Sequence, residues 1–308
     1  MNCRAAKPPE TKMPVVTVFT ATYNRAATLG RLYESLRAQD FTDFEWLIVD
    51  DGSTDGTDLL VDEWRQAGSP FSIRYVHKEN GGKHTAHNMG VSLAKGDYFA
   101  IVDSDDWYPP EALGILVWQW ESMSPLEKEK FANVEGMCCL ADGTLIGSPF
   151  PADRHVSDNF SILSERKQSG DTMGMYRTEV LRSYPFPEGF DGLFVPESLV
   201  WNRIARQYKT LFINRITGVK EYRKDGITRG GLTLRLRNAE PFMLYYRELL
   251  NQATRGRFRI RANLVRLSLR AGRSSTRDLL GQISVVEELA VSLVGRMLYW
   301  RDRLGGMM

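Results

Sequence analysis

Three carboxylates stand within four positions of the chain, at Asp103, Asp105 and Asp106, directly after an apolar pair. Carboxylates this close repel one another and raise each other's pKa unless a positive charge lies among them. The cluster holds no Cys or His, so a bound cation would have hard oxygen ligands, which suit Mg²⁺ or Mn²⁺. We therefore expect Asp103 and Asp105 to hold a divalent metal. The alternative is an acidic turn that caps the helix expected near Pro109.

Polar loops earlier in the chain carry groups that suit a nucleotide diphosphate. Tyr23 could stack on a ring, and Asp51 could accept a hydrogen bond from a base or ribose group. Lys83 and Arg25 supply positive charge for phosphates, which arginine can bind in a bidentate manner. Neither a Gly-x-Gly-x-x-Gly nor a P-loop pattern occurs at the first predicted strand–helix turn. This argues against a dinucleotide-dependent dehydrogenase and against a P-loop NTPase.

These loops are expected at one edge of a sheet, because each follows an apolar, β-branched run. The predicted strands are residues 15–20, 45–49, 73–76 and 98–102. Helical spacing of apolar residues follows each of the first three strands, and another helical stripe follows the acidic cluster. Strands that alternate with helices predict an α/β fold with a mostly parallel sheet. The loops after parallel strands gather at the carboxyl edge, where ligands bind in such sheets.

The middle of the chain has a less regular pattern. A turn at 141–143 predicts a hairpin between residues 136–140 and 144–147, and residues 149–170 are expected to be a long loop or an insertion. Residues 173–176 are expected to re-enter the sheet before a short helix near 178–182. A helix is predicted after Glu197, and two further strands are expected at 211–213 and 218–222.

Composition bounds the class of protein. The 308 residues have a formal net charge of +2 and 43% hydrophobic content, as in ordinary globular proteins. Three cysteines do not make a disulfide framework, and no apolar run reaches the roughly 18–20 residues that span a bilayer. The first twelve residues form a polar lead without the apolar core of a signal peptide. We expect a cytoplasmic protein whose contact with the inner face of the cell membrane, if made, is peripheral.

The C-terminal region differs from the rest in charge. Residues 235–308 contain fourteen Arg, no Lys and six acidic residues, which gives +8 in three helical segments. This divides the chain into a lead at 1–12, a main domain at 13–234 and an Arg-rich helical extension at 235–308. The extension is interpreted as a solvated helical cap or as a surface that docks on anionic lipid. Nucleic acid is disfavoured as a partner, because no recognisable binding module is present and the remainder is acidic.

The order of these motifs resembles that of family 2 glycosyltransferases with the GT-A fold, over roughly residues 13–225. The matching stretches are Thr22-Tyr23-Asn24-Arg25, the block from Asp50 to Asp55, Asn80-Gly81-Gly82-Lys83 with Ala86, Asn88 and Gly90, and Gly96-Asp97-Tyr98 before the acidic cluster. The resemblance implies a hexosyltransferase-type enzyme. It would transfer a sugar with inversion from a nucleotide-diphosphate sugar, with Mg²⁺ or Mn²⁺ as cofactor.

The resemblance also assigns site residues by position. Asp51 would bind the base in a pocket lined by Thr22 and Tyr23, Asp103 would lie near the ribose and the metal, and Asp105 would be the principal metal ligand. Asp106 would be structural. The predicted nucleotide-sugar-binding set is Thr22, Tyr23, Arg25, Asp51, Ser53, Lys83, Asn88 and Asp103.

Inversion needs a general base opposite the departing diphosphate. Where many relatives have Glu-Asp at a helix start, this chain has Glu197-Ser198, so Glu197 becomes the candidate base and Asp191 the second choice. His84 and His87 are candidates for metal or phosphate contacts, or for a helix surface. Lys220 and its neighbours stand where relatives carry a late segment that closes over the diphosphate, although they also suit an ordinary strand.

The resulting expectation is transfer from a UDP- or dTDP-sugar to a glycan or lipid-linked acceptor during surface polysaccharide assembly. One alternative is a sugar nucleotidyltransferase, whose Gly-rich first loop is not matched by residues 22–25. The other is a nucleotide-sugar-binding scaffold without transferase activity, an alternative that Ser198 leaves open because it replaces the second acid.

Overall fold

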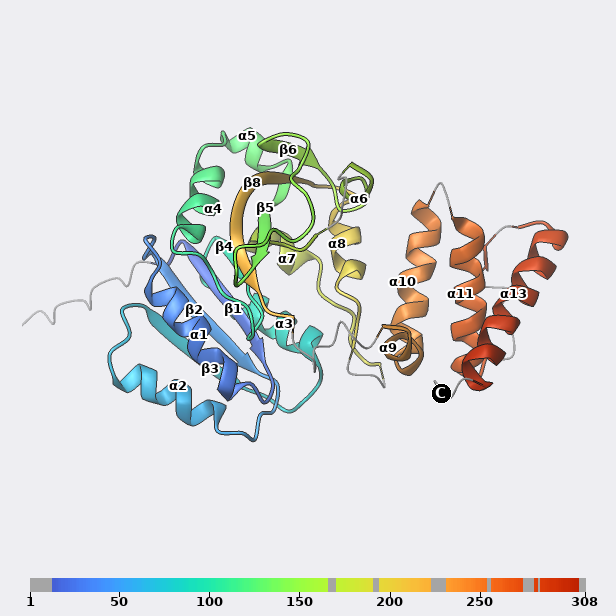
Figure 1. The fold of residues 1–308 in the computed structure, drawn as a ribbon, viewed down its shortest axis with the longest axis horizontal. Coiled ribbons are helices and arrows are strands. Elements are labelled where there is room, and N and C mark those ends of the chain that lie inside the picture. The colour runs from blue at the N-terminus through green and yellow to red at the C-terminus, as the bar shows by residue number, and fades with distance from the viewer. Residues whose placement is uncertain are drawn as a thin grey trace, which may run out of the picture.

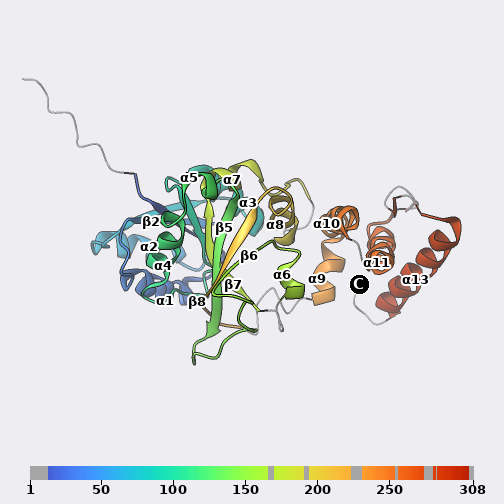
Figure 2. The same ribbon diagram turned by 90° about the horizontal axis from the view of Figure 1, so that it is seen from above.

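The computed structural model describes residues 13–165, 170–190, 194–222, 231–253, 256–273, 280–281 and 283–304. A sheet domain occupies one end of the described chain, and a bundle of C-terminal helices lies beside it (Figure 1). Seen from above, the bundle continues away from the sheet on the side of α8 (Figure 2).

Eight strands form one sheet in the order β3-β2-β1-β4-β7-β5-β8-β6. Their bounds are β1 Val16–Thr22, β2 Phe44–Asp50, β3 Ser72–His77, β4 Tyr98–Ile101, β5 Phe131–Leu140, β6 Arg154–Ser157, β7 Thr172–Arg177 and β8 Lys209–Lys220. The first four strands pair in parallel, as the alternating pattern predicts. Strand β7 is antiparallel to both β4 and β5, and β8 is parallel to β5. The carboxyl end of β8 therefore lies at the same sheet edge as those of β1 to β4.

Helices cover both faces of this sheet. Their bounds are α1 Ala26–Arg37, α2 Thr57–Gln66, α3 Lys83–Leu93, α4 Ala112–Glu121, α5 Pro125–Lys128, α6 Ile162–Glu165, α7 Thr178–Ser183 and α8 Ser198–Ile204. Alternating strand residues make two cores, one shared with α1, α2 and α4 and the other with α3, α7 and α8. This alternation sends one set of side chains to each face. Gly90 lets α3 lie close to β1, since a Cβ there would be 2.2 Å from Cε2 of Phe19.

The C-terminal helices have a core of their own. They are α9 Gly231–Arg237, α10 Ala239–Gln252, α11 Arg257–Arg270 and α13 Val285–Leu304. Two buried arginines in this bundle are paired: Arg261 with Glu287, and Arg266 with Asp302. A bidentate pair from Arg203 of α8 to Glu248 of α10 joins the bundle to the sheet domain, with Nη2 2.6 Å from Oε1. The helical character of the extension is confirmed, while its boundary at residue 235 stays a prediction.

Three later features differ from the expected pattern. The segments 211–213 and 218–222 were expected to be separate strands, but residues 209–220 form the single strand β8. Register shifts against β5 let the polar pair at 214–215 bulge without ending the strand. The segment 149–170 contains the edge strand β6 and the short helix α6 among its described residues. The turn at 141–143 forms, but residues 144–147 make only a bridge at Cys139 and Leu145.

Candidate active site

The loops after β1 and β2 are fastened to each other. The amide of Asn24 donates to Oγ of Ser53 at 2.7 Å, and the amide of Thr54 donates to Oδ1 of Asn24 at 2.8 Å. Asn24 has a φ of 52°, a left-handed conformation that asparagine tolerates. Asp55 accepts a hydrogen bond from the amide of Ala26 at 2.9 Å. The two loops therefore form one rigid corner, with Ser53 as a structural part of it.

Asp51 is buried at this corner, with 4% of its surface exposed. Its carboxylate accepts hydrogen bonds from the amides of Gly81 and Gly82, at 2.9 and 2.7 Å. Nζ of Lys78 lies 2.6 Å from its Oδ1. The carboxylate thus holds the loop after β3 in place. Contact of Asp51 with a nucleotide base stays a prediction.

Sequence reasoning missed Lys78, although it directly follows β3 at the carboxyl edge. Position at this edge was the available signal, but the partner of Lys78 could not be read from the chain. Around the same corner, the hydroxyl of Thr22 is buried and has no hydrogen-bond partner among the described residues. Tyr23 is 51% exposed, so its ring is accessible for stacking. Arg25 precedes the first turn of α1.

Lys83 brings the acidic cluster and Glu197 together. It is the first residue of α3, and its Nζ lies 2.5 Å from Oδ1 of Asp103 and 2.7 Å from Oε1 of Glu197. Burial opposes the lysine charge, but the two carboxylates outweigh burial and raise the pKa of Lys83 well above its usual value. Burial likewise disfavours ionisation of Asp103, yet the charges of Lys83 and Lys220 bring its pKa below the usual range.

The three aspartates after β4 have different surroundings. No hydrogen bond or ion pair reaches the half-buried carboxylate of Asp105 from any described residue. Asp106 is buried, and its Oδ2 lies 2.5 Å from Nζ of Lys220 at the end of β8. Burial raises the pKa of Asp106 to about 6, although Lys220 acts in the opposite direction. The cluster therefore contains one carboxylate that no described residue contacts, one paired with Lys83 and one paired with Lys220 of β8.

Arg31 of α1 holds the loop that carries these aspartates. Its Nη2 donates to the carbonyl oxygen of Asp105 at 2.8 Å and to Oε2 of Glu221 at 2.6 Å. Its guanidinium lies 3.9 Å from the ring centroid of Trp107. These contacts fix the backbone of Asp105 while they leave its carboxylate unengaged. Sequence reasoning missed Arg31, because it stands on an exposed helix face with no motif around it.

The chemistry of the donor set fits a hard cation. Within the described ranges, no group of three or more His, Cys, Asp or Glu side chains is arranged to hold a metal ion. Asp103 and Asp105 can supply two carboxylates, and among the described residues the second has no partner to displace. Mg²⁺ commonly binds through one or two carboxylates and takes its other ligands from water and substrate phosphates. The pair therefore suits an ion that arrives with a diphosphate.

Glu197 immediately precedes α8 and has a half-exposed side chain. The structure thus brings the predicted base to the acidic cluster through Lys83. Asp191, the second choice, lies outside the described residues. Ser198, which replaces the second acid of the motif, is the first residue of α8.

Asn88 and the two histidines of α3 face the interior. The amide of Asn88 is bonded to the backbone of Phe186 in both directions, at 2.9 and 2.8 Å, which clamps the segment before α8. His87 is enclosed by aromatic rings, and burial lowers its pKa to about 3. Burial also lowers the pKa of His84. His87 is therefore a core residue, and a nucleotide contact of Asn88 stays a prediction.

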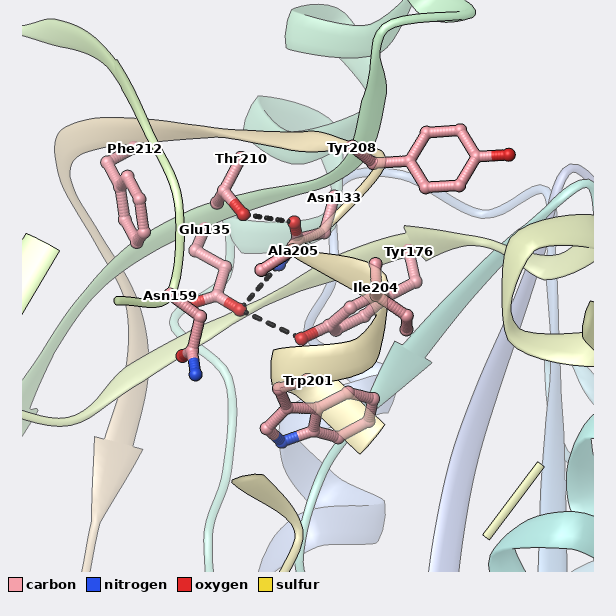
Figure 3. A pocket seen from close by; sticks show the side chains of 10 residues that line it. All are labelled: Asn133, Glu135, Asn159, Tyr176, Trp201, Ile204, Ala205, Tyr208, Thr210 and Phe212. Carbon is pink, nitrogen blue, oxygen red and sulfur yellow. Dashed lines mark hydrogen bonds between the residues drawn. The ribbon is translucent and has the colours of Figure 1, made fainter. Parts of the chain in front are cut away.

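A separate polar pocket lies beneath α8. Figure 3 shows Glu135 directed towards Asn133 and Tyr176, which donate to its carboxylate at 2.7 and 3.1 Å. The enclosed volume is about 20 Å³, which is room for a single water molecule. Trp201 of α8 lines the pocket and stacks on Tyr176. None of its lining residues belongs to the predicted site. The side chains around the pocket therefore pack against α8 and have no assigned role in the site.

Parts of the chain are similar in sequence to known glycosyltransferases. Residues 17–123 match the family model described as glycosyl transferase family 2. The chain is 26% identical over 245 residues to the GalNAc(5)-diNAcBac-PP-undecaprenol beta-1,3-glucosyltransferase of Campylobacter jejuni. This match covers 77% of this chain and 73% of that protein. The chain is also 35% identical over 98 residues to EpsH of Bacillus subtilis, which is named "Putative glycosyltransferase EpsH", and this match spans 28% of EpsH.

Solved structures share the fold over most of the chain. Residues 1–349 of S. aureus TarS, in complex with UDP-GlcNAc, superpose with a TM-score of 0.62 at 20% identity, over 91% of this chain and 79% of that TarS chain. The mannosyltransferase PcManGT of Pyrobaculum calidifontis, in complex with GDP-Man and Mn²⁺, gives 0.56 at 19% identity, over 96% of this chain and 90% of PcManGT. Residues 17–123 are thus similar to glycosyl transferase family 2, and the sheet with its flanking helices has the GT-A fold of these solved structures.

Proposed function

We propose that the chain is a metal-dependent glycosyltransferase that transfers a sugar with inversion from a UDP- or dTDP-sugar. The observation that carries the proposal is the position of Lys83 between Asp103 and Glu197, at 2.5 and 2.7 Å. This links the acids that suit a metal-bound diphosphate to an acid suited to activate an acceptor. An acidic cap alone would not need either of these longer-range contacts.

The donor would lie along the carboxyl edge of the sheet. The exposed ring of Tyr23 is suited to stack on the base, and the corner at Asp51 is suited to hold the nucleoside. Asp103 and Asp105 would hold Mg²⁺ or Mn²⁺, which supplies charge neutralisation for the leaving diphosphate. A nucleotide-sugar donor is supported by TarS, solved with UDP-GlcNAc, and metal use by PcManGT, solved with Mn²⁺.

Glu197 would act as the general base. Its carboxylate takes the proton of the acceptor hydroxyl while the hydroxyl oxygen forms a bond to the anomeric carbon. The bond from that carbon to the diphosphate oxygen breaks, and the nucleoside diphosphate leaves with the electron pair. Attack opposite the leaving group inverts the anomeric centre. Lys83 would restrain the orientation of Glu197 before the acceptor arrives.

The acceptor proposed is a glycan or a lipid-linked glycan of surface polysaccharide assembly. Support comes from the Campylobacter jejuni relative, whose name states an undecaprenol diphosphate-linked acceptor. A lipid-linked acceptor would keep the enzyme at the inner face of the cell membrane. None of the helices that the structure describes has the length and apolar character needed to cross a bilayer.

A non-catalytic nucleotide-sugar-binding protein is the second candidate, because Ser198 stands where many relatives have the second acid. A panel of nucleotide sugars, with and without Mn²⁺, separates the candidates by thermal shift and by release of nucleoside diphosphate with a lipid-linked acceptor. A metal-dependent shift together with release supports the transferase. A shift without release supports the binding protein. Formation of a nucleotide sugar from UTP and a sugar phosphate would support a nucleotidyltransferase.

A further inference from the structure

The outermost helix of the C-terminal bundle, α13, has one face that no described residue covers. It packs on α11 through Val291, Gly295 and Asp302. A Cβ on Gly295 would lie 2.5 Å from Cβ of Val265, so the two helices approach closely on this side. Figures 1 and 2 both place α13 at the end of the molecule farthest from the sheet.

The opposite side of α13 carries a continuous apolar stripe. Its members follow one another at intervals of three and four residues, so they lie on one helix face. They are between 52% and 86% exposed, and they are Val286, Leu289, Leu293, Met297, Trp300 and Leu304. Solvent-facing helix surfaces normally carry polar residues at these positions. A stripe of this length, which ends near a tryptophan, indicates a surface that is covered by another phase or partner.

Charges on α13 are sorted between its two sides. Arg296, Arg301 and Arg303 are exposed and, at 100° per residue, flank the apolar stripe. Glu287 pairs with Arg261 of α11, and Asp302 is buried against Arg266. Glu287 and Glu288 both lie within about 60° of the buried side of the helix. The side that carries the apolar stripe is therefore bordered by cations.

We propose that α13 is the element by which this protein binds an anionic lipid bilayer. The helix lies in the plane of the interface, with the apolar stripe among the acyl chains and the three arginines on lipid phosphates. A second copy of the chain is a poorer occupant, because pairing two such faces would bring arginines against arginines. Six charged residues within the 20-residue helix also make it unsuitable for a transbilayer orientation.

This inference deepens the proposed membrane location but does not depend on the transfer reaction. It is tested with the full-length protein by flotation with vesicles of phosphatidylcholine alone or mixed with phosphatidylglycerol. The wild type is expected to float with the anionic vesicles and much less with the neutral ones. Mn²⁺-dependent binding of UDP, measured on the same preparations, reports on the donor site separately.

Three variants separate the contributions to flotation. Leu289→Gln/Leu293→Gln removes apolar area and should weaken vesicle binding by about tenfold or more. Arg296→Gln/Arg303→Gln should weaken binding to anionic vesicles only. Leu59→Gln is the matched control, since Leu59 is 72% exposed on α2 in the sheet domain, and it should float like the wild type.

Two results would overturn the proposal. The first is equal flotation of the wild type and the Leu289→Gln/Leu293→Gln variant, with both proteins folded by circular dichroism. The second is a wild type that does not float but forms a dimer in sedimentation experiments that the same leucine substitutions abolish, which would make a second copy the occupant. Loss of UDP binding with flotation intact would instead count against the proposed transferase and leave the membrane inference standing.

Discussion

Nζ of Lys83 lies 2.7 Å from Oε1 of Glu197, and this contact joins the start of α3 to the residue before α8. Through its second contact with Asp103, the same ammonium group links the proposed base to the proposed metal cluster. The proposed acceptor side and the proposed donor side of the site are thus connected by a single side chain.

Glu197→Gln is expected to retain UDP binding but to lose transfer by about 10²-fold or more, because the amide cannot accept the acceptor proton. Calorimetry measures the binding, and release of UDP with acceptor present measures the turnover. Asp191→Asn is the comparison variant. Normal turnover of Glu197→Gln together with an inactive Asp191→Asn would transfer the role of the base to Asp191.

Asp106→Asn is expected to reduce the free energy of unfolding by about 3 kcal/mol, because it removes the carboxylate that forms the direct, largely buried ion pair with Lys220. Asp105→Asn is the matched control. The Asp105 carboxylate has no partner among the described residues, so the change should stay within about 0.5 kcal/mol. Urea denaturation measures both. Equal destabilisation of the two variants would contradict the separation of the three aspartates into one structural and two ligand residues.

The strands that deliver these residues could be predicted from the sequence, because β1 to β4 are short apolar runs that end in polar turns. The two late segments could not be joined into β8, since the polar pair at 214–215 resembles a loop until its bulge against β5 is known. The apolar–polar pattern reports which face of an element is buried. It does not indicate where a β-bulge shifts the register between neighbouring strands.

The side-chain partners within the site could not be predicted from the sequence, because they too depend on how the strands are arranged. Lys78 with Asp51, and Lys83 with Glu197, are contacts between residues far apart in the chain, and each depends on the order of strands in the sheet. The motif around Asn88 predicted where this residue lies in the chain's order of motifs, but not which group its side chain contacts. In the folded chain its amide clamps Phe186, which gives it a structural role that no spacing indicates.

His87 predicts a pH dependence of stability. Its pKa is lowered by burial to about 3 in the folded protein, so between pH 6.5 and pH 3 the unfolded chain binds the extra proton. The contribution of the uncharged His87 to the free energy of unfolding is therefore fully present above pH 6.5. It decreases as the pH falls from 6.5 towards 3. Relative to His87→Phe, the wild type should lose about 2 kcal/mol of unfolding free energy between pH 8 and pH 5.

Urea denaturation of both proteins across this range measures the difference. His77→Gln serves as the control, because the exposed side chain of His77 is not taken out of water by folding. Parallel stability curves for the wild type and His87→Phe would show that His87 does not reside in the aromatic enclosure.

Gly90 and Gly30 make a matched pair for the packing of the sheet domain. Gly90→Ala should destabilise the fold by about 1–3 kcal/mol, because the new Cβ would lie 2.2 Å from the ring of Phe19. Gly30→Ala should stabilise it by about 0.5–1 kcal/mol, since nothing lies within 4 Å of a Cβ there and α1 is helical on both sides. Thermal denaturation measures both, and effects of the same sign would contradict the close approach of α3 to β1.

The most direct test of the donor site is calorimetric titration of UDP into the wild type and into Asp105→Asn, each with and without Mn²⁺. Because the Asp105 carboxylate is unengaged by the described residues, its replacement should change the ligand site and leave the fold intact. We expect the wild type to bind UDP at least about tenfold more tightly with Mn²⁺ than without it, and the variant to lose this dependence. Identical Mn²⁺-dependent binding by both proteins would contradict the assignment of Asp105 as the principal metal ligand.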